Sequence, residues 1–160
     1  MIISDRPFLR QRSKVWNDEA ILNEAAAILR KRLRRLGTLS DPTTATDFLK
    51  MRLAGLEQEV FYVLYLDTKH RIIEAEPAFT GTIDSAEVHP RVIVRRALEL
   101  NAAALICAHN HPSGDPTASL SDHALTNKLK EALGLVDIRL LDHFVVTAEA
   151  FTSLAAMGRV

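Results

Sequence analysis

The chain has 160 residues, 48% hydrophobic and 25% charged, which is enough for one domain with a sizeable core. Its formal net charge is zero, which excludes a uniformly basic nucleic-acid-binding protein. A single cysteine, Cys107, excludes an intrachain disulfide. The sequence shows neither a signal peptide nor an apolar run of the ~20 residues that a membrane span needs. We therefore expect a cytoplasmic protein.

The N-terminal quarter is predicted to be an irregular basic arm followed by one helix. Apolar residues recur at helical spacing over residues 18–36, with Asn17 as the N-cap and Gly37 as the stop. Residues 30–35 give this helix a basic outer face, which is either a solvated surface or a contact to phosphates. We therefore separate a basic arm and helix, residues 1–40, from a second unit, residues 41–160.

In the second unit helical and strand patterns alternate, after one early β-hairpin. This order predicts the α/β class, a mixed β-sheet with flanking helices. Helices are expected at residues 44–54, 90–100, 119–133 and 149–157, and strands at 59–66, 71–79, 103–109 and 138–146, the last as one strand or two.

Two histidines one residue apart, His109 and His111, stand at the end of an apolar strand pattern. Residues i and i+2 of a strand point to the same face, so both imidazoles would aim at one spot. Ser119 and Asp122 follow at the start of the next helix, where they also fit a capping box. Two imidazoles, one carboxylate and an open position are the requirements of a catalytic zinc ion.

This pattern, His-x-His, seven residues, Ser, two residues, Asp, resembles the JAMM, or MPN-plus, metalloprotease motif. Its surroundings resemble the RadC (UPF0758-like) family from about Leu53 to Val160. The resemblance implies a JAMM/MPN-like fold, related to that of cytidine deaminases, with one Zn²⁺ on His109, His111 and Asp122. It includes His89-Pro90-Arg91, His109-Asn-His-Pro-Ser-Gly-Asp-Pro-Thr117 and Leu141-Asp142-His143, and the run His-Asn-His-Pro-Ser-Gly is highly specific to that family.

The resemblance also implies a function, that of a zinc-dependent JAMM-type metallopeptidase or isopeptidase with a peptide or protein substrate. Glu59, at the start of the first strand, matches the position of the general base that acts on a metal-activated water. Glu57 is the alternative base, two residues earlier and on the same strand face. Ser119 is implied to stabilise the oxyanion by a hydrogen bond. Manganese or iron would fit similar ligands.

Four residues near the motif have more than one interpretation. Either Asp142 or His143 could reach the site behind the ligands, or both could make only structural hydrogen bonds within the sheet. Cys107 shares the strand face of the two histidines, and it is either a fourth ligand or, as we favour, a small buried core residue. Thr126 could orient a neighbouring side chain.

Longer RadC proteins begin with a helix-hairpin-helix DNA-binding region, whose hairpin needs a Gly-x-Gly-like sequence. Residues 1–55 contain only Gly37 and Gly55, so we expect that region to be absent or shortened. The alternative function is a DNA-associated, repair-linked accessory protein with a structural or vestigial metal site. A nuclease that uses the same metal also stays open. A zinc deaminase is excluded because it needs Pro-Cys-x-x-Cys and the chain has one cysteine.

Overall fold

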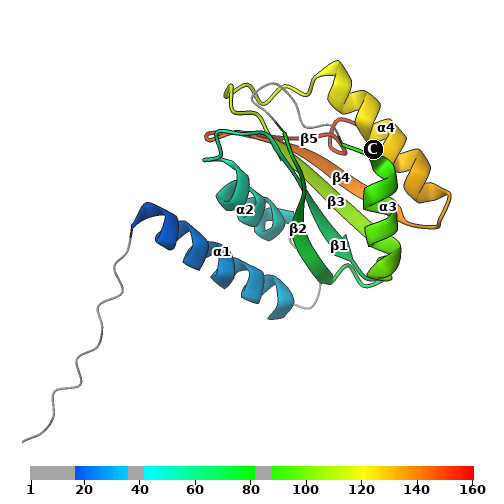
Figure 1. Cartoon of the computed structure of the whole chain (residues 1–160), viewed down its shortest axis with the longest axis horizontal. Helices are drawn as coiled ribbons and strands as arrows, with labels where there is room; N and C mark the ends of the chain where they lie inside the picture. Colours follow the sequence, from blue (N-terminus) through cyan, green and yellow to red (C-terminus); the bar gives the residue numbers. More distant parts are fainter. Residues whose placement is uncertain (1–16, 36–41, 82–87) are drawn as a thin grey trace, which may run out of the picture.

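The structure is a computed structural model that describes residues 17–35, 42–81 and 88–160 (Figure 1). The predicted basic arm and the predicted helix stop at Gly37 lie outside these residues. The side chains of residues 30 and 32–35 lie outside them too, so the basic face of the first helix is not placed. Among the described helices, none combines the length and the apolar character needed to cross a bilayer.

Five strands form a single mixed sheet in the order β2-β1-β3-β4-β5. The predicted hairpin is formed by β1 (Val60–Leu66) and β2 (Ile72–Thr80). In the centre, β3 (Ala104–Asn110) is antiparallel to β1 and parallel to β4 (Arg139–Val146). Every residue of β1 and β3 is buried, which explains why both read as continuous apolar runs rather than as alternating patterns.

Helices cover both faces of this sheet, so the predicted α/β class with flanking helices is confirmed (Figure 1). Helices α1 (Asp18–Arg35) and α2 (Pro42–Leu53) lie on one face, and α3 (Pro90–Glu99) and α4 (Leu120–Gly134) lie on the other. The Asn17 side chain caps α1 as predicted, since its Oδ1 accepts a hydrogen bond from the Ala20 N–H at 2.7 Å.

The two faces of the sheet carry separate core clusters. Phe48 and Leu53 of α2 pack with Tyr62 of β1, whereas Leu129 of α4 packs with Phe61. Successive residues of a strand point to opposite faces, so the odd-numbered residues of β1 and β3 face α3 and α4. This parity directs the end of β3 toward the N-terminus of α4.

The predicted final helix at residues 149–157 is wrong. The chain instead forms an edge strand, β5 (Phe151–Ser153), which pairs antiparallel with β4 and is followed by a turn. Two contacts with β4 override the helical pattern of these residues. The β5 backbone pairs the outer edge of β4, and Asp142 accepts hydrogen bonds from Ser153 Oγ at 2.6 Å and Ala155 N at 3.0 Å.

We expect Asp142→Ala to lower the free energy of unfolding by about 1.5–3 kcal/mol, the usual range for hydrogen bonds to a charged group. The carboxylate is the joint acceptor that holds the turn after β5 against β4. Denaturant unfolding followed by circular dichroism measures the change. Asp47→Ala, at an exposed position of α2, is the matched control. Equal losses in the two variants would contradict a clamping role for Asp142.

Candidate metal centre

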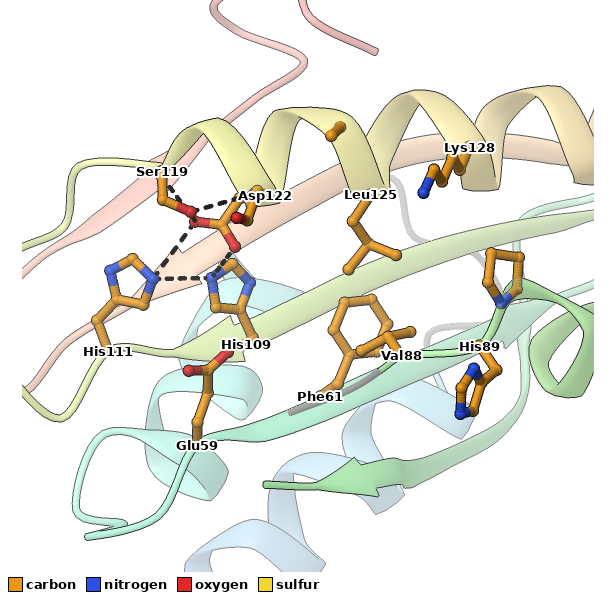
Figure 2. A pocket seen from close by; sticks show the side chains of 13 residues that line it. Glu59, Phe61, Val88, His89, His109, His111, Ser119, Asp122, Leu125 and Lys128 are labelled. Atoms are coloured by element: carbon orange, nitrogen blue, oxygen red, sulfur yellow. Dashed lines mark hydrogen bonds and ion pairs between the residues drawn. The ribbon is translucent and has the colours of Figure 1, made fainter. Parts of the chain in front are cut away.

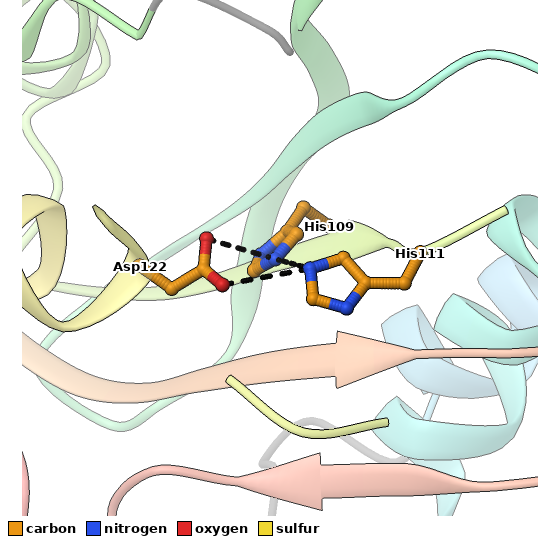
Figure 3. Close-up of side chains that lie close together, drawn as sticks. All are labelled: His109, His111 and Asp122. Atoms are coloured by element: carbon orange, nitrogen blue, oxygen red, sulfur yellow. Dashed lines mark hydrogen bonds and ion pairs between the residues drawn. The ribbon is translucent and has the colours of Figure 1, made fainter. Parts of the chain in front are cut away.

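His109, His111 and Asp122 meet at the carboxyl end of β3 (Figure 3). One ligand atom from each of the three lies within 4.8 Å of the others. His109 Nε2 is 3.0 Å from His111 Nε2 and 3.2 Å from Asp122 Oδ1, and His111 Nε2 is 3.5 Å from Asp122 Oδ2. The structure therefore brings together the three residues that the sequence proposed as ligands.

The capping box of α4 aims the Asp122 carboxylate at the histidines. Ser119 Oγ accepts a hydrogen bond from Asp122 N at 3.1 Å, and Asp122 Oδ2 accepts from Ser119 N and from Ser119 Oγ, both at 2.7 Å. The same hydrogen bonds therefore cap the helix and orient the Asp122 carboxylate toward His109 and His111.

The chemistry of these donor atoms fits a cation. His111 Nδ1 lies 2.9 Å from the backbone oxygen of Asp115, which can only accept, so Nδ1 carries the proton of the neutral imidazole. The Nε2 of His111 then presents a lone pair to the Asp122 carboxylate and to His109 Nε2. This lone pair, the carboxylate and His109 Nε2 thus converge on one point, where either a proton on His109 or a metal ion can satisfy them. Imidazole and carboxylate donors suit zinc and related divalent metals.

Electrostatics keep Asp122 ionised and make Glu59 more basic. Burial by itself would raise the pKa of Asp122, but the hydrogen bond and charge of His109 and the hydrogen bonds from Ser119 lower this pKa below its ordinary value. Burial raises the pKa of Glu59, and His109 and His111 oppose this rise while Asp122 adds to it. The site therefore contains one anionic carboxylate suited to ligation and one carboxylate suited to accepting a proton.

Glu59 and Glu57 occupy different environments. Glu59 directly precedes β1, lines the same cleft as the three candidate ligands, and directs its carboxylate toward His109 and His111 (Figure 2). Glu57 is exposed and is not among the described residues that line this cleft. Of the two candidate bases, only Glu59 is in a position to reach the metal centre.

Asn110, a residue that the sequence analysis did not single out, anchors the backbone on both sides of Glu59. Its Oδ1 accepts a hydrogen bond from Val60 N at 2.8 Å, and its Nδ2 donates to the backbone oxygens of Leu56 at 3.2 Å and Gln58 at 2.9 Å. A carboxamide between two histidines in a buried apolar strand was the available signal, because buried amides are almost always hydrogen-bonded.

The candidate metal centre opens into a cleft of about 660 Å³ (Figure 2). Glu59 and the candidate ligands form one end of this cleft. Phe61, Val88 and Leu125 form an apolar wall beyond them, and His89 and Lys128 lie farther along. The site is therefore accessible to a molecule much larger than water.

The structure also distinguishes between the roles that the sequence left open for Asp142, His143 and Cys107. His143 contacts the site, with its Nε2 at 2.9 Å from His109 Nδ1 and its Nδ1 at 2.6 Å from Thr126 Oγ1. Asp142 points away from the site and bonds to the turn after β5. Cys107 is fully buried in the core cluster beneath α4, the position favoured from the sequence, and burial raises the pKa of its thiol.

Burial gives His143 a measurable effect on stability. It lowers the pKa of this imidazole to about 3, from an ordinary 6.5, with repulsion from His109 as the next cause and an opposing attraction from Asp122. As the pH falls below 6.5 the unfolded chain takes up a proton that the folded protein does not. The free energy of unfolding should then fall by about 1.4 kcal/mol per pH unit from this group.

Denaturant unfolding of chelator-treated protein between pH 5 and 6 tests this prediction, because the window lies above the range in which most carboxylates titrate. His143→Gln removes the ionisable group, so its stability should depend less steeply on pH than that of the unsubstituted protein, by about one proton. Parallel slopes for the two proteins would show that His143 is not held neutral.

The fold, a mixed five-stranded sheet flanked by helices, is that of a JAB/MPN-like domain, and in this chain it carries the group of His109, His111 and Asp122. The model of the RadC-like JAB domain matches residues 39–159. This chain therefore belongs to the RadC-like JAB domain family.

Curated relatives share this similarity over most of the chain. A UPF0758 protein of Vibrio cholerae is 49% identical over 141 residues, which cover 88% of this chain and 89% of the relative. A UPF0758 protein of Xanthomonas campestris is 54% identical over 128 residues, 80% of this chain. One from Alcanivorax borkumensis is 51% identical over 141 residues, 88% of this chain. The matched segment spans 57% and 63% of the last two relatives, which are longer.

Proposed function

We propose that this protein is a metal-dependent hydrolase of the JAMM type, with Zn²⁺ as the expected metal and peptide or isopeptide bonds as the expected target. The observation that carries the proposal is the meeting of His109, His111 and Asp122 in an open cleft beside Glu59. We assign the catalytic unit to residues 41–160, which the family match largely covers.

His109 Nε2, His111 Nε2 and the Asp122 carboxylate would hold the metal. A divalent ion bound there supplies Lewis acidity, which acidifies water and polarises a carbonyl oxygen. Asp122 contributes a negative charge, and the hydrogen bonds from Ser119 keep its carboxylate oriented. The open cleft on the Glu59 side leaves room for water and substrate.

Glu59 acts as the general base. Its carboxylate takes a proton from the attacking water and later returns that proton to the leaving amine. Burial raises its pKa, which strengthens it as a base, and the hydrogen bonds of Asn110 to the backbone of residues 56, 58 and 60 hold it at the rim of the site.

Ser119 supplies a hydroxyl beside the reacting group. In the structure this hydroxyl donates to Asp122 Oδ2, which also accepts from the Ser119 N–H. The hydroxyl would exchange its bond for one to the substrate oxygen as negative charge develops there, while the N–H keeps Asp122 in place. Removing one such oxyanion donor typically costs ~100- to 1,000-fold in kcat.

The cleft favours an extended polymer segment as substrate. Its apolar wall of Phe61, Val88 and Leu125 begins next to the metal centre and leads toward Lys128. An apolar surface of this kind can take up a side chain next to the bond that is cleaved. We therefore propose a peptide or protein substrate, with the apolar side chain placed against Val88 and Leu125, which are partly exposed.

A substrate panel tests the proposal. Zinc-loaded protein is incubated with unstructured peptides, an isopeptide-linked conjugate, single-stranded DNA and RNA, and the Glu59→Gln variant serves as the blank. Cleavage of a peptide or isopeptide that requires both zinc and Glu59 supports the proposal. Zinc-dependent cleavage of nucleic acid alone would replace it with a nuclease. Nucleic-acid binding without any cleavage would favour the DNA-associated accessory role.

A further inference from the structure

Behind His109, on the side away from the cleft, runs a chain of three short hydrogen bonds. His109 Nδ1 lies 2.9 Å from His143 Nε2, His143 Nδ1 lies 2.6 Å from Thr126 Oγ1, and Thr126 Oγ1 lies 2.6 Å from the backbone oxygen of Asp122. His143 and Thr126 are fully buried, and His109 is only 1% exposed. This hydrogen-bond chain runs from His109 on β3 through His143 on β4 to Thr126 on α4. It ends on the backbone oxygen of Asp122, a second candidate ligand.

Counting protons gives this chain a direction, starting from its Thr126 end. A contact of 2.6 Å between two oxygens requires a hydrogen between them, and the Asp122 carbonyl has none to offer. Thr126 therefore donates its single hydroxyl proton to Asp122. The equally short contact between Thr126 Oγ1 and His143 Nδ1 must then contain the proton of His143.

The same reasoning continues to His109. A buried imidazole whose two ring nitrogens face a histidine and a threonine is held neutral, because no opposite charge is in contact with it. With its proton on Nδ1, His143 presents a lone pair at Nε2. The proton in the 2.9 Å contact therefore belongs to His109 Nδ1, which leaves Nε2, on the side of the cleft, as the nitrogen of His109 that can offer a lone pair to a metal.

We propose that Thr126 and His143 are positioning residues that fix His109 in the tautomer whose Nε2 lone pair faces the metal. The inference rests on the metal site of the proposed function. It adds that the backbone oxygen of Asp122, one candidate ligand, fixes the tautomer of His109, another, because Asp122 is the last acceptor of the hydrogen-bond chain. The N-terminal turn of α4 thereby orients the Asp122 carboxylate through Ser119 and His109 through Thr126.

Ring contacts hold the same geometry. The Phe61 ring is nearly parallel to His109, with an interplanar angle of 9° and a centroid distance of 6.4 Å, and its centroid is 5.4 Å from that of His143. These contacts restrict rotation of the imidazoles, but they do not depend on which ring nitrogen holds the proton. The hydrogen bonds through His143 and Thr126 do distinguish the two tautomers, because they require a proton at His109 Nδ1.

Thr126→Val tests the proposal, because it keeps the branched shape and removes the hydroxyl. Without an acceptor at Nδ1, the His143 proton should move to Nε2, and His109 should then carry its own proton at Nε2. We expect the ¹⁵N resonances of His109 and His143 to report this exchange in metal-free protein. Zn²⁺ affinity, measured by chelator competition, should fall about 10- to 100-fold, the usual effect of losing a partner behind a ligating histidine.

Two variants separate tautomer control from loss of packing. Thr126→Ser restores the hydroxyl and should return both the ¹⁵N pattern and the Zn²⁺ affinity to those of the unsubstituted protein. Thr46→Val changes another buried helical threonine, in α2 on the opposite face of the sheet, and should leave both unchanged. If Thr126→Val does not fold, Thr126→Ala removes the same hydroxyl with a smaller side chain.

The proposal is overturned if His143 carries its proton on Nε2 in the unsubstituted protein. It is also overturned if Thr126→Val is less stable but keeps the original tautomers and Zn²⁺ affinity. Failure of the proposed function is a separate result. A protein that binds no Zn²⁺ would refute the metal centre, whereas the ¹⁵N spectra of metal-free protein would still decide the direction of the hydrogen-bond chain.

Discussion

Glu59→Gln should lower kcat by about 100- to 10,000-fold while leaving Zn²⁺ affinity and stability nearly unchanged. The amide keeps the size of the side chain but cannot accept the proton of the attacking water. Glu59 is not one of the three residues grouped as candidate ligands, so its loss removes the base and leaves the metal donors in place. Steady-state kinetics on the substrate found by the panel, together with chelator competition for Zn²⁺, measures both effects.

Glu57→Gln is the matched control for this substitution. It removes the same charge two residues away, at an exposed position outside the cleft, and should leave kcat within the error of measurement. Comparable losses in both variants would mean that the negative charge near the start of β1 matters in general. A loss confined to Glu57→Gln would reverse the assignment of the base.

His109→Ala should weaken Zn²⁺ binding by more than the ~100-fold that loss of a supporting partner can cause. His109 is the most enclosed of the three donors, at 1% exposed, and its Nε2 contacts both other ligand groups. Metal content after dialysis measures the loss. Thermal unfolding gives a second measure, because free Zn²⁺ at 100 times the Kd stabilises a folded protein by about 2.7 kcal/mol.

His70→Ala is the control for histidine removal, since His70 lies in the turn between β1 and β2 and bonds to Arg139 at 3.1 Å. It should retain Zn²⁺ and the stabilisation that Zn²⁺ confers. Because alanine at position 109 also leaves a cavity, Asp122→Asn provides a second test with little change in volume. Unchanged metal content in both His109→Ala and Asp122→Asn would refute the metal centre.

Several features of the site follow from residues that are close in sequence. The spacing of His109 and His111 on a strand ending predicts a shared face, and the structure has their Nε2 atoms 3.0 Å apart. The Ser119 and Asp122 capping box is likewise a three-residue pattern, and it forms as predicted. The continuous apolar runs of β1 and β3 indicated buried central strands for the same local reason.

Other features depended on contacts between distant parts of the chain. Residues 149–157 have a helical pattern, but residues 151–153 form β5 and a turn follows, because the edge of β4 and the Asp142 carboxylate offer hydrogen-bond partners that a helix would not use. The choice between Asp142 and His143 depended on which face of β4 met α4. The choice between Glu59 and Glu57 depended on where the segment before β1 was anchored.

The sequence by itself therefore determined the candidate ligands, the α/β class and the capping of α4, since strand parity and helix caps act within a few residues. Tertiary structure alone decided how these ligands are supported. Asn110 reaches 50 residues back to Val60, and His143 reaches 34 residues back to His109 and 17 back to Thr126. No local periodicity encodes such hydrogen bonds, because they exist only once the strands are aligned and α4 lies across them.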